Sequence, residues 1–113
     1  MHLARALGKG TEAHERMLRA QLVEGELLED DATLARLMAE IGIPEGRTLD
    51  VLASDRFTAE VEEEIQDAAA LGCTGVPFFV FDRKYGVSGA QGSDVFLNVL
   101  RRVRELESAP AEA

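Results

Sequence analysis

Few side chains in this 113-residue chain could carry chemistry, and the only thiol among them is Cys73. Disulfide exchange needs one thiolate to attack and a second thiol to resolve the mixed disulfide. One cysteine permits neither a Cys-x-x-Cys pair nor an intramolecular disulfide nor a four-cysteine zinc site. Cys73 follows the predicted end of a helix, where the helix dipole disfavours a thiolate, and no Lys, Arg or His lies within three residues, so we interpret it as a structural thiol. The alternative is an exposed thiol that can be oxidised or can form a mixed disulfide.

The remaining polar groups lack the spacing of metal or catalytic sites. His2 and His14 fall in predicted helices without a His-x-x-x-His or His-Glu-x-x-His pattern. One predicted helix face carries five carboxylates, namely Glu60, Glu62, Glu63, Glu64 and Asp67. Carboxylates along a helix are usually a solvated surface, whereas a metal site needs ligands that converge. With no Gly-x-Ser-x-Gly motif and no phosphate-binding glycine loop either, we predict no catalytic residue, no metal and no cofactor.

Composition and charge narrow the possible partners. The chain is 46% hydrophobic and 29% charged, which is the balance of a folded domain, and its length suits one core. The net charge of -9 disfavours nucleic acid and anionic membrane, because both need a basic surface. No apolar run approaches the ~18 to 20 residues that span a bilayer. We expect a cytoplasmic chain that binds neither nucleic acid nor membrane.

Residues 1 to 72 show the spacing of helices and hold 16 acidic against 7 basic side chains, which accounts for the whole surplus of -9. Thr11 and Asp31 are predicted caps of two of these helices. Met17, Leu18 and Leu22 are expected to face inward, as are Val61 and Ile65. The predicted helices span 1–9, 11–24, 31–41, 48–53 and 55–71.

After Gly72 the pattern changes. Phe78 to Phe81 is a continuous apolar run, which predicts a strand covered on both faces. A polar turn follows, and Tyr85 to Ser88 is expected to return as an antiparallel strand. Ser93 is the predicted cap of a last helix to about Glu107, and the tail from Ser108 is expected to be frayed.

A run of 17 residues in this second part carries a family resemblance. The run is Gly75-Val76-Pro77-Phe78-Phe79-Val80-Phe81-Asp82-Arg83-Lys84-Tyr85-Gly86-Val87-Ser88-Gly89-Ala90-Gln91. It resembles the signature of FrnE-like proteins in the DsbA family of thiol-disulfide oxidoreductases. The helical part resembles the domain that this family inserts into its thioredoxin fold, with Glu24-Gly25-Glu26 and Leu52-Ala53-Ser54-Asp55 at similar places. The resemblance covers residues 1 to 107.

The resemblance implies an α/β fold rich in helices. Residues 1–72 correspond to the helical insertion domain, and residues 73–107 correspond to the C-terminal half of a thioredoxin fold, a β-hairpin followed by a helix. Residues 108–113 form the frayed tail. The first βαβ half of that fold, which carries the Cys-x-x-Cys of the family, is expected to be absent from this chain.

The resemblance also implies a site at Gly75, Val76 and Pro77. In the family the proline that matches Pro77 has a cis peptide bond and lies beside the redox dithiol. The residue that matches Val76 offers its backbone N–H and C=O to an extended substrate peptide, which is a form of strand addition. We therefore expect this loop to bind an extended peptide or a protein thiol substrate.

Two functional hypotheses follow. The first is a partial DsbA-like thiol-disulfide oxidoreductase that is inactive alone, because the Cys-x-x-Cys is missing. The alternative is a non-catalytic peptide-binding or assembly module derived from that family. In either case the strand at 78–81 lacks the neighbour that the family supplies on one side. An open strand edge is a template for pairing, so we expect a homodimer or association with a separate N-terminal half.

Overall fold

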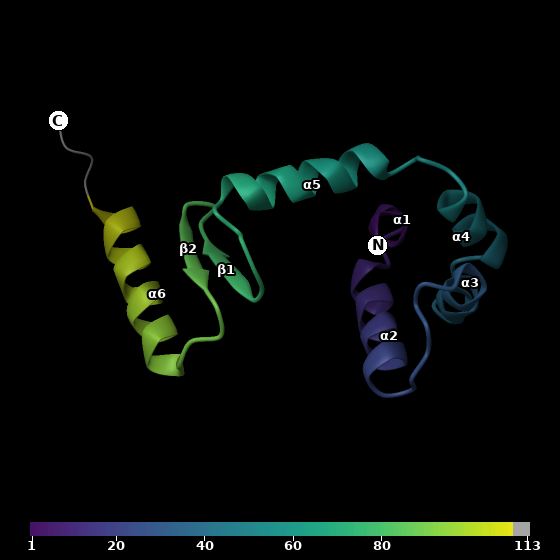
Figure 1. Ribbon diagram of the computed structural model, residues 1–113, viewed down its shortest axis with the longest axis horizontal. Coiled ribbons are helices and arrows are strands. Elements are labelled where there is room, and N and C mark those ends of the chain that lie inside the picture. The colour runs from purple at the N-terminus through teal and green to yellow at the C-terminus, as the bar shows by residue number, and fades with distance from the viewer. Residues whose placement is uncertain (110–113) are drawn as a thin grey trace. The chain divides into compact units, whose positions relative to one another are not determined.

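A computed structural model describes residues 1–109 of the chain (Figure 1). Six helices and two strands follow one another as α1 (His2–Ala6), α2 (Gly10–Leu22), α3 (Asp31–Glu40), α4 (Glu45–Leu52), α5 (Thr58–Ala70), β1 (Phe78–Phe81), β2 (Tyr85–Ser88) and α6 (Ser93–Ser108). A helix-rich chain with one antiparallel sheet is the α/β class that the sequence predicts. The predicted tail begins too early, because Ser108 still belongs to α6. The rest of that tail, residues 110–113, lies outside the described residues.

The contacts divide the chain into two compact units, Met1–Val61 and the residues from Glu62 onward. We call them the helical unit and the hairpin unit. The division falls inside α5, whereas the sequence pattern changes at the end of that helix, at Gly72. Helix α5 has no buried residue, and its predicted inward residues Val61 and Ile65 are exposed. The sequence of α5 contains an apolar stripe, but no other part of the described chain covers it.

The core of the helical unit comes from three helices and the turn after α3. Its buried side chains are Leu3, Ala4, Ala13, Ala20, Leu37, Met38 and Ile43. Helix α2 contributes alanines, and the prediction that Leu18 and Leu22 face inward is wrong because both are exposed. At about 100° per residue, Leu18 and Leu22 lie on the side of the helix opposite Ala13 and Ala20. The small alanine side chains allow the neighbouring helices to approach closely.

Two predicted helix caps differ from the structure, that of α3 by one residue and that of α2 by two. Helix α3 is capped by Asp30, whose carboxylate accepts hydrogen bonds from Thr33 N at 3.0 Å and Thr33 Oγ1 at 2.7 Å. These bonds hold the pKa of Asp30 below its usual value. Helix α2 begins at Gly10 after Lys9, with no side-chain cap, so Thr11 is already inside the helix. Backbone geometry, which the sequence pattern does not resolve, decides between adjacent cap positions.

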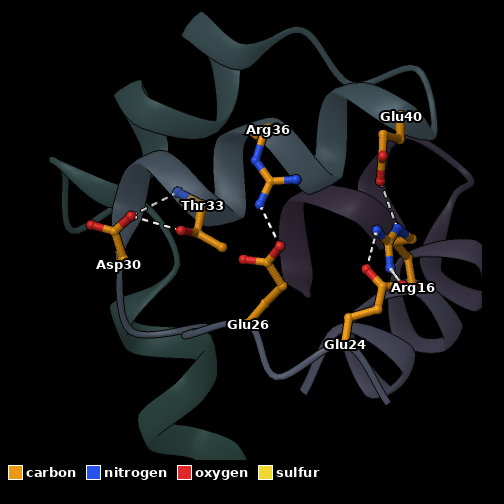
Figure 2. A network of polar contacts seen from close by, with 7 residues as sticks. All are labelled: Arg16, Glu24, Glu26, Asp30, Thr33, Arg36 and Glu40. Carbon is orange, nitrogen blue, oxygen red and sulfur yellow. Dashed lines mark hydrogen bonds and ion pairs between the residues drawn. The ribbon is translucent and has the colours of Figure 1, made fainter. Parts of the chain in front are cut away.

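A polar network ties α2 to the loop after it and to α3 (Figure 2). Arg16 on α2 donates to Glu40 at 2.6 Å and to both oxygens of Glu24 at 2.8 and 2.9 Å. Beside it, Arg36 pairs with Glu26 at 2.9 Å. The hydrogen bonds from Arg16 lower the pKa of Glu24. The pKa of Arg16 is raised in turn by its hydrogen bonds to Glu24 and Glu40. This network therefore holds the loop after α2 against α3.

Acid should destabilise the helical unit partly through Glu24. Because its folded pKa lies below the usual 4.5, the contribution of Glu24 is complete above that pH and is lost as the pH falls through the folded value. We expect Arg16→Met to lower stability at neutral pH and to flatten its dependence on pH. Urea unfolding followed by circular dichroism from about pH 6 to about pH 3 measures this. Arg47→Met, which removes an exposed charge on α4, is the matched control. Equal pH slopes for Arg16→Met and the wild type would contradict the assignment.

The hairpin unit contains the sheet of two antiparallel strands. Phe78 pairs with Ser88 and Phe81 with Tyr85, and the polar turn has positive φ at Asp82 and Arg83. The predicted antiparallel return is therefore correct. The prediction that this strand is covered on both faces is wrong, since Phe79 and Val80 are exposed. Within the described residues, the apolar side chains of β1 are therefore only partly covered.

Helix α6 lies after the hairpin and begins at Ser93, although Ser93 is not its cap. Gly92 occupies the cap position without a side-chain hydrogen bond. The helix has no buried residue, and its contact with the hairpin includes the Phe79 and Phe96 rings, edge to face with centroids 4.7 Å apart. Within residues 1–109, no helix combines the length and the apolarity needed to cross a bilayer.

Candidate peptide-binding edge

The loop from Gly72 to Pro77 is positioned by the way α5 ends. The Gly72 N–H donates to Ala69 O and the Cys73 N–H donates to Ala68 O, both at 3.0 Å. This is a Schellman motif, in which the residue after the helix adopts a left-handed conformation, and Gly72 has a φ of 90°. A side chain at position 72 would be strained there, so glycine is needed to turn the chain from α5 toward β1.

The three residues predicted to bind a peptide, Gly75, Val76 and Pro77, are exposed on one continuous segment. Val76 is 91% exposed, and the Val76–Pro77 peptide bond is cis. Cys73 precedes them as a half-buried thiol whose Sγ donates to the carbonyl of Gly75 at 3.4 Å. This bond holds the thiol within its own loop. The segment thus presents the backbone of Val76 and Pro77 to solvent immediately before the strand.

The register of the hairpin shows which backbone groups of β1 remain open. The Gly89 N–H donates to Pro77 O at 2.8 Å, which makes Pro77 and Gly89 a hydrogen-bonded pair in the ladder. Antiparallel pairs alternate, so Phe79 and Phe81 also direct their N–H and C=O toward β2. The same groups of Phe78 and Val80 therefore point to the opposite edge, where no third strand pairs with β1 in the part of the chain that the structure describes.

A groove of about 370 Å³ lies between α5 and this strand. It is lined by Glu64, Asp67, Ala68, Leu71, Cys73, Val76, Phe78, Val80 and Arg83. Phe78 and Val80 face the same side of the sheet because strand side chains alternate. The Phe78 ring extends over Gly86 on β2, where an added Cβ would lie 2.6 Å from the end of the ring. The open edge and the groove are therefore adjacent, with backbone groups along one and apolar side chains in the other.

The sequence pattern assigned no role in peptide binding to two charged residues of this groove, Asp67 and Arg83. Asp67 belongs to the acidic face that we interpret as solvated, and Arg83 lies in the turn between the strands. They pair across the groove at 3.8 Å, and both are exposed, so the pair contributes little energy. Asp67 precedes Ala68 and lies one helical turn before Leu71, both of which line the groove. This spacing is the only feature of the sequence that places Asp67 near Ala68 and Leu71. It does not show which element the Asp67 side of α5 faces.

The other face of the hairpin is held by α6. The Tyr85 hydroxyl donates to Glu107 Oε1 at 2.9 Å, and Lys84 Nζ lies 3.2 Å from the same oxygen. The hydrogen bond from Tyr85, followed by that from Lys84, lowers the pKa of Glu107. Together with the contact between the Phe79 and Phe96 rings, these hydrogen bonds hold α6 against one face of the hairpin. The opposite face, which carries Phe78 and Val80, lines the groove.

The histidines and carboxylates considered above as possible metal ligands do not converge on one point. Among residues 1–109, no set of three His, Cys, Asp or Glu side chains is placed to hold an ion. The five carboxylates of α5 are all exposed, as expected for a solvated helix face. His2 stacks on Phe57 with ring centroids 5.7 Å apart.

A comparison with known families gives the family that this chain matches. The family described as DSBA-like thioredoxin domain matches residues 1–101 of the chain. The match includes the helices of the helical unit, the loop at Val76 and Pro77, the hairpin and the first half of α6. No curated protein matches the chain.

Proposed function

Because the chain belongs to the family of DSBA-like thioredoxin domains, we propose that it is the peptide-binding portion of a FrnE-like thiol-disulfide oxidoreductase. The observation that carries this proposal is the open edge of β1 beside Val76 and Pro77. A thiol-disulfide oxidoreductase must hold an extended segment of its substrate while the sulfurs exchange, and strand addition uses backbone groups that are independent of sequence. The function is therefore binding of an extended peptide or protein thiol substrate.

The bound peptide would pair with the outward backbone groups of Phe78 and Val80. Val76 would extend the same recognition at the loop, as its family position implies. Peptide side chains that point toward α5 would lie in the groove between Ala68, Leu71 and the Phe78 ring. Main-chain bonds would supply the affinity, and the groove would select side chains that are apolar with a charged end able to meet Asp67 or Arg83.

The chain alone would not turn over disulfides. Exchange needs a resolving thiol after the first attack, and Cys73 is the only cysteine. The dithiol would come from a Cys-x-x-Cys segment, supplied by a chain that carries the first half of the thioredoxin fold. The proposed location is the cytoplasm, because a single cysteine is not a disulfide framework and cytoplasmic thiols stay reduced.

We expect no catalysis of insulin reduction by this chain. The precipitation of insulin by dithiothreitol, followed with and without the purified protein, should proceed at the same rate. Addition of a thioredoxin-fold half bearing Cys-x-x-Cys is the positive arm, and it should accelerate the reaction only if the two parts assemble. Clear acceleration by the chain alone, abolished in Cys73→Ser, would contradict the proposal.

A second function is favoured by the single cysteine. Here the chain is a non-catalytic peptide-binding or assembly module, which uses the same edge without redox chemistry. The two functions make different predictions in the positive arm above. Binding of peptide without acceleration by any Cys-x-x-Cys partner would favour the module, whereas acceleration would favour the oxidoreductase portion.

The open edge also suggests how the chain associates. Without a peptide, two copies can pair their β1 edges about a two-fold axis, because an antiparallel strand is complementary to itself. A two-stranded sheet is marginal alone, so pairing would stabilise it. We propose a homodimer through β1, or association of β1 with the chain that supplies the first half of the fold. Peptide and partner then compete for one edge.

A further inference from the structure

The groove between α5 and β1 carries more acid than base, and this imbalance limits which side chains it can take from a peptide on the β1 edge. The charged side chains that line it are Glu64, Asp67 and Arg83. The base among them, Arg83, already lies 3.8 Å from Asp67. Helix α5 itself holds five carboxylates and neither Lys nor Arg. The groove is therefore net negative.

The groove combines an apolar floor with charges that remain in water. Ala68, Leu71 and Phe78 are half-buried lining residues. The side chains of Asp67 and Arg83 are 54% and 81% exposed. Lys and Arg side chains match such a surface, because their aliphatic stems cover apolar groups while the charged end stays in water. A Glu or Asp side chain has a shorter stem and the sign of charge that the groove repels.

The pleat of β1 determines which residues of a bound peptide meet the groove. Phe78 and Val80 face the groove, and Phe79 faces α6, where its ring contacts Phe96. Residues directly opposite each other on neighbouring strands share one face of the sheet. The peptide residues opposite Phe78 and Val80 therefore point into the groove, and the residue between them meets Phe79. Because Phe79 is 41% exposed, an apolar side chain at that position would cover it.

From the charge of the groove, its apolar floor and this pleat, we infer that the peptide bound at the β1 edge is cationic. It has Lys or Arg at the two positions opposite Phe78 and Val80, with an apolar residue between them. The cationic ends lie near Glu64 and Asp67. Arg83 yields its place, because its pair with Asp67 is exposed and weak. The inference rests on the proposed peptide-binding edge and specifies the substrate class of that edge.

Three synthetic peptides test the sign of the charge. They have the sequence Thr-Thr-X-Val-X-Thr-Thr, with blocked ends and with Lys, Gln or Glu at both X positions. We expect the Kd for the full chain to rise in the order Lys, Gln, Glu, by about threefold from Lys to Gln and about tenfold from Lys to Glu. Fluorescence anisotropy of the labelled peptides at low ionic strength measures the three values.

Variants separate the groove from the general charge of the chain, because a net charge of -9 attracts any cationic peptide. Asp67→Asn and Glu62→Gln each remove one carboxylate from α5, but Glu62 lies about 140° from Asp67 around the helix and does not line the groove. We expect Asp67→Asn to reduce the preference for Lys over Glu to about threefold or less, and Glu62→Gln to retain it. Arg83→Asn, which removes the competing base, should increase the preference. Asparagine tolerates the φ of 54° at that position.

Two results would overturn the inference and leave the peptide edge in place. They are equal Kd values for the Lys and Glu peptides in the wild type, and an equal loss of preference in Asp67→Asn and Glu62→Gln. Absence of binding by all three peptides would instead overturn the proposed edge, and the inference with it. If Asp67→Asn does not fold, Arg83→Asn decides, and an unchanged preference in that variant would also overturn the inference.

Discussion

Replacing Val80 by proline should abolish association at the β1 edge while the hairpin stays folded. Proline removes the backbone N–H, and the Val80 N–H points away from β2, so no bond of the β1 and β2 ladder is lost. The ring also occupies the space that an added strand needs. We expect self-association and binding of an extended peptide to weaken by about tenfold or more. Light scattering measures the first, and titration with alkylated insulin B chain measures the second.

Two neighbouring substitutions control for other effects of the change. Val80→Ala removes most of the same side chain but keeps the N–H, so it should retain association. Phe79→Pro removes an N–H that faces β2 and should disrupt the hairpin itself. Undiminished association of Val80→Pro, with a folded hairpin, would show that the chain associates through another surface.

Truncation of Leu37 should have the largest effect on stability. Leu37 is 0% exposed at the centre of the helical unit, and Leu37→Ala leaves a cavity that its neighbours fill only in part. Such substitutions cost about 2 to 5 kcal/mol in the free energy of unfolding. This is a large share of the stability of a unit this small, so we expect partial unfolding at moderate temperature. Thermal unfolding followed by circular dichroism measures the loss.

Leu27→Ala is the matched control for this experiment. Leu27 is 63% exposed, so the same change of side chain should alter the free energy of unfolding by no more than about 0.5 kcal/mol. Equal losses in the two variants would mean that Leu37 is not the centre of the packed core.

Local patterns predicted the elements because local physics decides them. Leu34, Leu37 and Met38 recur at helical spacing and identify α3, and the run from Phe78 to Phe81 identifies β1. The 17-residue run at Gly75 to Gln91 pointed to the DSBA-like family, whose match over residues 1–101 confirms the coarser part of that resemblance. The candidate binding loop was available from the sequence for the same reason.

Features that depend on contacts between elements could not be predicted. The apolar stripe at Val61 and Ile65 indicates an inward face, but the described chain provides nothing to cover it. Asp67 and Arg83 meet only because of how α5 ends and how the hairpin turns. Thr48 on α4 has no distinguishing neighbour in the sequence, so the burial of its side chain emerges only from tertiary packing.

Amide hydrogen exchange in β1 tests most directly the claim that its open edge binds an extended peptide. The wild-type chain is compared with and without alkylated insulin B chain, at a concentration low enough to limit self-association. The account predicts slower exchange at Phe78 and Val80, whose N–H groups face the open edge, and no change at Phe79 and Phe81, which face β2. Unchanged exchange at Phe78 and Val80 with saturating peptide, or equal slowing at all four residues, would contradict it.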